Sequence, residues 1–305
     1  MAGIAIDKAG RRSRWDMDGR ATAPAAGTVL NALATGRGAA FAIERTVTAS
    51  VHLDGSDGVT GEVADAPGLG SDEDPDASLI ERCVELAVAR HGDGQGGTVR
   101  TESEVPLAAG LKSSSAAANA AVLATLDALG VVDDVDPLDA CRLGVQAARD
   151  AGVTVTGAFD DASASMLGGL TVTDNAADEL LARDEPSWDV LVWTPPRRAY
   201  SAAADVDRCR RIAPVAHLVA DLALSGDYGV AMTVNGLAYA VALGFSAEPL
   251  MEALPHATGV SLSGTGPSVV AVGDRDDLAE VRSAWDRREG ETWLTTTRAT
   301  GAVPG

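Results

Sequence analysis

The chain has 305 residues, of which 46% are hydrophobic and 22% charged, a composition typical of a globular protein with about two domains. Its 24 Lys and Arg residues against 44 Asp and Glu residues give a formal net charge of -20, which disfavours nucleic acid and anionic membranes as partners because both would be repelled. No apolar run is long enough to cross a membrane, the start is unlike a signal peptide, and the three cysteines show no zinc or disulfide spacing, so we expect a cytoplasmic location.

The charged residues are unevenly chosen. Lys8 and Lys112 are the only lysines, and aspartate outnumbers glutamate 30 to 14. A dense carboxylate surface with few lysines is typical of proteins from a salt-rich cytoplasm, where dissolved ions screen the repulsion between like charges. We therefore expect a halophilic source.

The first half of the chain mixes β-branched runs with Ala-rich helical runs. Residues 1–16 hold four positive charges and show no period, so we expect a disordered extension there. Residues 21–53 favour strands with a short helical stretch near Val29–Ala34. The pattern further predicts a loop over 54–76, helices over 78–89, 113–129 and 137–150, loops over 106–112 and 152–159, a short helix before Gly168, and strands over 98–105 and 170–173.

The second half has a different rhythm. It predicts strands over 190–193, 259–262, 268–272 and 292–296, and helices over 206–224, 230–243, 247–254 and 276–287. With the middle helices counted as one layer, the order is βαββαβ, the ferredoxin-like order. The acidic stretch 175–187 suggests the boundary, so we predict an α+β chain with one domain over 17–175 and another over 188–300.

The first segment that could carry chemistry runs from Pro106 to Asn119. A glycine-bearing loop leads into three serines that open an Ala-rich helix, and the first N–H groups of a helix lack internal partners and lie at its positive end. This arrangement suits a phosphate group, although a serine that simply caps a core helix remains an alternative. The candidate phosphate-binding residues are Pro106, Leu107, Ala108, Ala109, Gly110, Leu111, Lys112, Ser113, Ser114, Ser115 and Ala116.

Two further segments are candidates. Asp160 and Asp161 stand side by side in a small, apolar stretch, where one could orient or deprotonate a hydroxyl or bind Mg²⁺, or both could merely cap a helix. Gly264, Thr265 and Gly266 lie between two apolar strands, as a ligand-closing wall or as an ordinary hairpin turn.

In this order the three segments resemble the GHMP kinases. The Pro-x-x-x-Gly-Leu-x-Ser-Ser pattern of that family matches residues 106–114, its acidic pair followed by two glycines matches 160–169, and its C-terminal glycine pattern matches 263–268. Four stretches are most similar to the archaeal branch that phosphorylates shikimate: residues 23–36 with Asn31, residues 110–115, residues 156–162, and Asn235-Gly236. Asp161, where homoserine kinases have Asn, favours the same branch. The resemblance covers roughly residues 20–272 and implies a ribosomal-S5-like N-terminal domain and a ferredoxin-like C-terminal domain with the active site between them.

The resemblance also implies roles for individual residues. ATP would place its phosphates at the helix that begins at Ser113, with Mg²⁺ near Ser114, and Asp160 would act on the 3-hydroxyl of shikimate. Asp161, Gly264, Thr265 and Gly266 would contact the substrate. The family often has a Glu metal ligand upstream of the catalytic Asp; here Asp150 is the nearest carboxylate, so we expect it to contact the metal.

Other functions are kept open. A homoserine kinase, or another small-alcohol kinase of the same family, would show the same segments. An inactive nucleotide-binding protein on this fold is disfavoured by the intact carboxylates at 160 and 161. A dinucleotide-dependent oxidoreductase is disfavoured because Gly264-Thr265-Gly266 lacks the third glycine and the later acidic residue of that fingerprint.

Overall fold

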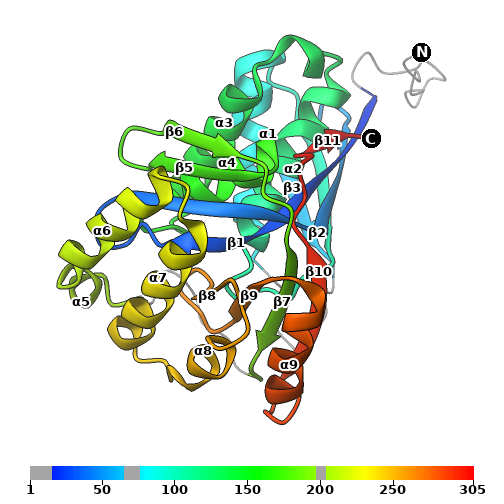
Figure 1. The fold of residues 1–305 in the computed structure, drawn as a ribbon. Coiled ribbons are helices and arrows are strands. Elements are labelled where there is room, and N and C mark those ends of the chain that lie inside the picture. Colours follow the sequence, from blue (N-terminus) through cyan, green and yellow to red (C-terminus); the bar gives the residue numbers. More distant parts are fainter. Residues whose placement is uncertain (1–15, 65–75, 197–203) are drawn as a thin grey trace, which may run out of the picture.

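The computed structural model describes residues 16–64, 76–196 and 204–305. Two β-sheets, each covered by helices, lie one above the other in Figure 1, with the long strands of the first sheet crossing the middle of the molecule. The N-terminal extension was expected over residues 1–16. All of it except Asp16 lies outside the described residues.

The first sheet is built on two long antiparallel strands, β1 (Met17–Leu30) and β2 (Arg37–Leu53). One half of β2, residues 47–53, pairs with β4, and the other half, residues 37–41, pairs with β5. The remaining strands extend these pairs or edge the sheet: β3 (Val59–Val63), β4 (Gly97–Ser103), β5 (Leu170–Asp174), β6 (Glu179–Asp184) and β11 (Val303–Pro304).

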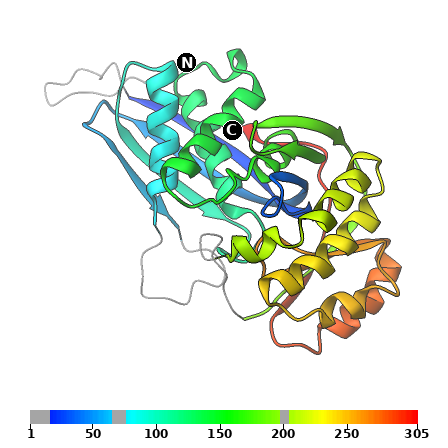
Figure 2. The same ribbon diagram turned by 90° about the vertical axis from the view of Figure 1, so that its left-hand side faces the viewer.

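Four helices pack against this sheet and one another: α1 (Ser78–His91), α2 (Ser113–Ala128), α3 (Pro137–Asp150) and α4 (Phe159–Leu167), with a short 3-10 turn, η1 (Val132–Asp134), before α3. Figure 2 shows them gathered at the N-terminal side of the molecule. Alanine is the best helix former, and its small side chain lets α2 lie close to β1 and β2, so 12 of its 16 residues are buried. This central helix carries the predicted phosphate segment at its start.

The second sheet has the strand order β10-β7-β9-β8, all antiparallel, which is the predicted ferredoxin-like order. Its strands are β7 (Asp189–Thr194), β8 (Gly259–Leu262), β9 (Val269–Gly273) and β10 (Glu291–Thr296). Its helices are α5 (Val206–Arg210), α6 (Ala213–Leu224), α7 (Tyr228–Leu243), α8 (Glu248–Ala253) and α9 (Arg275–Trp285). The predicted α+β class is confirmed.

Several local predictions were wrong. The stretch Val29–Ala34 is not helical, because β1 continues to Leu30 and a turn follows that ends at Gly36 with φ of 80°. The loop predicted over 54–76 contains β3, and the acidic stretch 175–187, for which no strand was predicted, contains β6. The domain boundary in that stretch stays a prediction. The helix predicted over 206–224 breaks into α5 and α6, because proline, here in the first turn of α6, is tolerated at a helix start and not within a helix.

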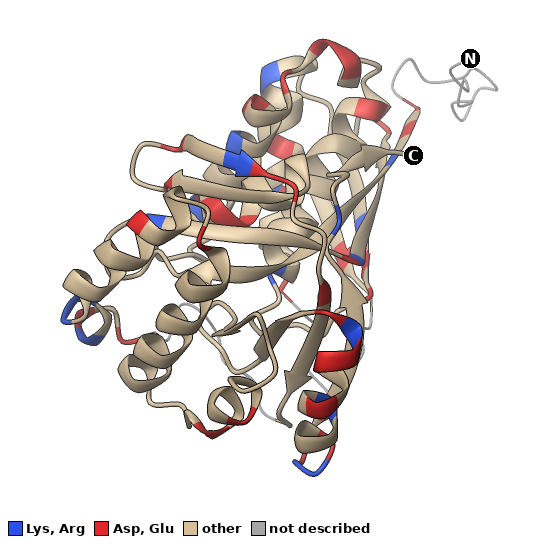
Figure 3. Ribbon diagram, viewed as in Figure 1, with Lys and Arg blue, Asp and Glu red and all other residues tan. Residues whose placement is uncertain are grey.

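The surface shows the charge imbalance of the composition. In Figure 3 acidic residues are scattered over loops and helices of both halves of the molecule, whereas α7 carries no charged side chain along its 16 residues. Within the described parts of the chain, none of the helices combines the length and apolar character needed to cross a bilayer.

Candidate active site

The start of α2 is left open toward solvent. Its N-cap residue is Lys112, which has a left-handed backbone (φ 63°) and no side chain suited to capping, so the serine-cap alternative is excluded. The first backbone bond back to Lys112 comes from Ala116, and no described residue accepts from the N–H groups of Ser113, Ser114 or Ser115. Three donors at the positive end of a buried helix are thus available to an anion.

The acidic pair lies in the first turn of α4, and the N-cap of this helix is Ala158, so neither carboxylate serves as the cap. Asp160 is held from two sides by Asn175: the Asn175 Nδ2 donates to Asp160 Oδ1 at 2.7 Å, and the Asp160 backbone N–H donates to Asn175 Oδ1 at 3.0 Å. A Cβ on Gly38 would come within 2.3 Å of Asp160 Oδ2, so β2 needs a glycine at this point. Asp160 is therefore wedged between β2 and Asn175.

Asp161 points elsewhere, because consecutive residues on a helix are turned by about 100°. Its Oδ1 lies 2.7 Å from Lys112 Nζ, and both side chains are about nine-tenths buried, at 12% and 9% exposed. Burial and the neighbouring Asp160 raise the pKa of Asp161 above the usual carboxyl range, while Lys112 acts in the opposite direction. The ion pair joins the start of α4 to the start of α2.

The glycine turn of the second sheet, residues 263–268, contacts the loop 106–112 before α2, which is named the phosphate loop after its predicted ligand. Ser263 Oγ donates to the Gly110 carbonyl at 2.8 Å, and the Ser268 N–H donates to the Ala109 carbonyl at 3.3 Å. Gly110 has φ of 79°, and a Cβ there would lie 2.3 Å from the Ser263 carbonyl oxygen, so only glycine fits. The glycine turn 263–268 thus packs directly against the loop 106–112.

All three segments meet at one cavity of about 720 Å³, within the usual size range for small-molecule sites. Its lining includes apolar side chains of β2 and α1, among them Val47, Leu79 and Ile80. Its ionisable groups are Asp76, which precedes α1, and Lys112, Asp160 and Asp161. Three of the four described non-glycine residues with positive φ (Ala108, Lys112 and Ala158) line this cavity, and such strain concentrates at functional sites.

Most of the predicted site residues come together here. Those that line the cavity are Leu107, Ala108, Gly110, Lys112, Ser113, Ser114, Ser115, Asp160, Asp161, Gly264 and Thr265. Pro106, Ala109, Leu111, Ala116 and Gly266 are not among the lining residues, and Ala109, Leu111 and Ala116 are buried. Asp150 is not brought into this group either, since Arg82 and Gln146 donate to its two carboxylate oxygens at 2.8 and 2.6 Å on the outer surface.

Two residues of the site escaped the sequence reasoning about roles. Asn175, 1% exposed, holds Asp160, and Asn31, 6% exposed, lines the cavity next to Gly264. A fully buried asparagine after a strand is a signal only once burial is known. Asn31 stood in a recognised segment, but nothing there indicated its contacts with the second sheet.

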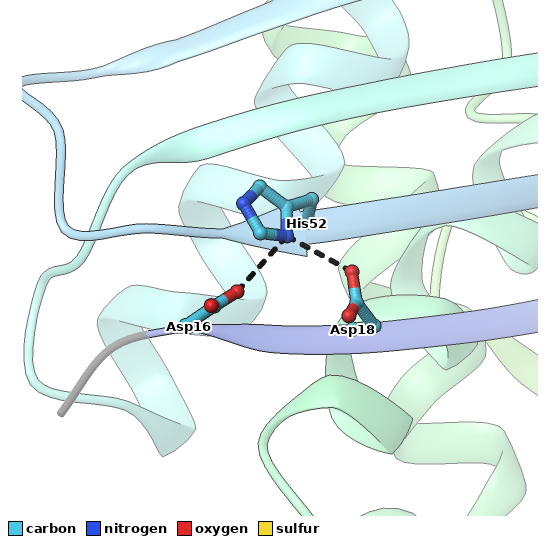
Figure 4. A group of neighbouring side chains, drawn as sticks. All are labelled: Asp16, Asp18 and His52. Carbon is cyan, nitrogen blue, oxygen red and sulfur yellow. Dashed lines mark hydrogen bonds and ion pairs between the residues drawn. The ribbon is translucent and has the colours of Figure 1, made fainter. Parts of the chain in front are cut away.

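A second cluster of ionisable groups lies outside this cavity, at the start of β1 and on β2 (Figure 4). His52 Nδ1 is 2.9 Å from Asp18 Oδ1 and 3.6 Å from Asp16 Oδ1. The side chains of His52 and Asp18 are 42% and 83% exposed. These are solvent-exposed contacts between a histidine and two carboxylates on an acidic surface, and they give no reason to place chemistry there.

Comparison with known proteins gives a consistent result. Residues 78–169 match the GHMP kinases N terminal domain, and residues 223–292 match the GHMP kinases C terminal domain. The shikimate kinase of Halobacterium salinarum is 65% identical over 287 residues, covering 94% of this chain and 99% of that protein, and that of Methanosarcina mazei is 49% identical over 291 residues, covering 94% and 97%. Among solved structures, homoserine kinase from Cytophaga hutchinsonii has a similar fold, with a TM-score of 0.72, 18% identity and coverage of 94% and 97%.

Proposed function

The chain belongs to the GHMP kinase family, and from this premise we propose that it is an ATP-dependent shikimate kinase in which Asp161 takes the proton of the acceptor hydroxyl. The observation that supports shikimate as the substrate is the 65% identity, over nearly the full length, to the shikimate kinase of Halobacterium salinarum. The open helix start, the lysine and the paired carboxylates around one cavity supply the groups that the reaction needs.

The triphosphate of ATP docks at the start of α2. The free N–H groups of Ser113, Ser114 and Ser115 and the ammonium group of Lys112 offset the phosphate charge, and the apolar part of the wall, with Val47, receives the base. Phosphoryl transfer depends mainly on positioning and charge neutralisation, and both are provided by fixed groups here.

The residues present also fit Mg²⁺. This hard cation prefers oxygen ligands and usually takes only one or two from the protein, the rest coming from phosphates and water. The Ser114 hydroxyl is exposed at the cavity beside the phosphate-binding N–H groups and is suited to this task. Asp150 is not included, because its carboxylate pairs with Arg82. When bound, the ion would neutralise charge that develops on the phosphate oxygens.

In the transfer step, the bond between the γ-phosphorus and the bridging oxygen of ADP breaks. A new bond forms between that phosphorus and the 3-hydroxyl oxygen of shikimate, and the hydroxyl proton passes to a carboxylate. The sequence assigned this proton to Asp160, but the contacts favour Asp161, since Asp161 faces the phosphate loop through Lys112. Asp160 is engaged by Asn175 and Gly38 and holds α4 in place.

A direct test is incubation of the purified protein with Mg·ATP and, separately, shikimate, homoserine and mevalonate in a salt-rich buffer, with ADP release coupled to a spectroscopic readout. We expect ADP formation with shikimate and the appearance of a phosphate monoester at its 3-position by ³¹P NMR. ADP formation with homoserine and not with shikimate would transfer the assignment to homoserine kinase. ADP formation with none of the three would refute the proposed acceptor.

The reaction fits a cytoplasmic setting, which we include in the proposal. Cys83, Cys141 and Cys209 are buried and unpaired, as expected of a chain that stays in a reducing compartment.

A further inference from the structure

A buried polar network joins the two sheets beneath the cavity. Asn31 follows β1, while Asn235 and Tyr239 lie on α7 of the second half of the chain. Asn235 Oδ1 accepts from the Asn31 N–H at 2.9 Å, and the Tyr239 hydroxyl donates to the Asn31 carbonyl at 2.8 Å. All three residues are at most 6% exposed.

Every hydrogen-bonding group of Asn31 is used in this network. Besides the two contacts to α7, its Nδ2 donates to the Gly264 carbonyl at 2.7 Å, and its Oδ1 accepts from the Leu33 N–H at 2.9 Å. Asn235 is equally occupied, since its Nδ2 donates to Ser261 Oγ at 2.8 Å. Burial raises the pKa of Tyr239, so its hydroxyl remains a donor. A fully satisfied buried network has one favourable arrangement, and removal of one member leaves its partners buried without a hydrogen bond.

The network touches both functional walls of the cavity. On one side the turn after Asn31 ends at Gly36, whose carbonyl accepts from the Asn175 N–H at 2.8 Å, and Asn175 holds Asp160. On the other side Asn31 binds the Gly264 carbonyl, and Lys112 Nζ lies 3.1 Å from the point where a Cβ of Gly264 would be. One asparagine is thereby linked to the wall that carries the acids and to the wall that binds the phosphates.

We propose that Asn235 and Tyr239 are positioning residues, which clamp Asn31 and thereby set the distance between the phosphate loop and the α4 carboxylates. This inference rests on the proposed kinase function. Neither residue lines the cavity itself, so both act through the turn 31–36, where the Tyr239 hydroxyl also accepts from the Ala34 N–H at 3.2 Å. The N–H groups at the start of α2 are not touched by either side chain. A small displacement of reacting groups is expensive in rate, and the loss therefore falls on kcat.

The sharpest test is Tyr239→Phe, which deletes one oxygen and keeps the buried ring. Thr233→Val is the matched control: Thr233 lies on the same helix, its hydroxyl donates to the Gly229 carbonyl at 3.0 Å and accepts from the Val260 N–H at 3.4 Å, and it makes no contact with Asn31. Asn235→Leu, which preserves shape and removes both polar atoms, is the stronger variant. The measurements are kcat and the KM for ATP and for shikimate, with the melting temperature of each variant.

We expect Tyr239→Phe to lower kcat about tenfold and Asn235→Leu to lower it further, with the KM for ATP changed by less than about twofold, because reacting groups are displaced while nucleotide contacts stay. Thr233→Val should keep the wild-type kcat even if its melting temperature falls as much as that of Tyr239→Phe. A Tyr239→Phe enzyme with the wild-type kcat, or a Thr233→Val enzyme with an equal loss, would overturn the proposal. Should Asn235→Leu fail to fold, Tyr239→Phe decides alone; inactivity of the wild-type chain on shikimate would instead refute the function.

Discussion

The helices α2 and α3 have similar lengths, 16 and 14 residues, but their starts are built differently. At α3, the Asp136 side chain accepts from the N–H groups of Leu138 and Asp139, and Pro137 occupies the first turn. At α2, Lys112 takes the N-cap position in a left-handed conformation and caps nothing, while its ammonium group reaches Asp161. The two helices pack on one another.

The difference separates stability from function. At a capped helix start the free N–H groups are hydrogen-bonded by a side chain, whereas at an open start they remain available to a ligand. The open start of α2 also has a strained, left-handed backbone at Lys112. The α2 start depends on the rest of the site to remain open and charged, so changes there should affect catalysis. Changes at the α3 start should affect only folding.

The largest loss of kcat is expected at Asp161, whose carboxylate pairs with Lys112 at the open start of α2. Asp161→Asn removes the proposed proton acceptor and should lower kcat by at least about 10²-fold while ATP still binds, given the usual value of a positioned base. Asp160→Asn is the matched variant one residue away, and its smaller loss, about tenfold, would come from the weakened Asn175 contact. Measured kcat values in the reverse order would return the base to Asp160.

The pH profile sharpens the same contrast. Burial raises the pKa of Asp161 to about 7, so the acid is protonated, and unable to accept a proton, below that range. Turnover should therefore rise with pH through neutrality. Lys112→Met removes the cation that favours the ionised form, so the rising limb should move to higher pH, as read from kcat against pH in both proteins. A limb that stays in place, or moves down, would contradict the role given to this ion pair.

The smallest effect is expected at the capped end. Asp136→Ala removes a side-chain cap that is worth about 1 kcal/mol in stability. The melting temperature should fall by a few degrees, measured by circular dichroism, with kcat and both KM values unchanged. A loss of activity larger than the loss of folded protein would show that the two helix starts are not as distinct as their contacts indicate.

Sequence patterns predicted some of these features well and others not at all. The helix over 137–150 was predicted to the residue, because a proline start and an amphipathic period act locally. β3 and β6 were missed since they are sheet-edge strands with exposed, polar residues and no continuous apolar run. The acidic pair was found, but which carboxylate faces Lys112 depends on where α4 begins. The contact between Asn31 and Asn235 spans 204 positions and leaves no trace in local spacing.

The ion pair between Lys112 and Asp161 also bears on what kind of anion the site favours. Two opposite charges 2.7 Å apart offer little net field beyond their immediate surroundings. An anion is therefore attracted mainly by the three N–H groups at the start of α2 that have no acceptor among the described residues. Several donors side by side suit a ligand with several oxygen atoms better than a small monatomic ion.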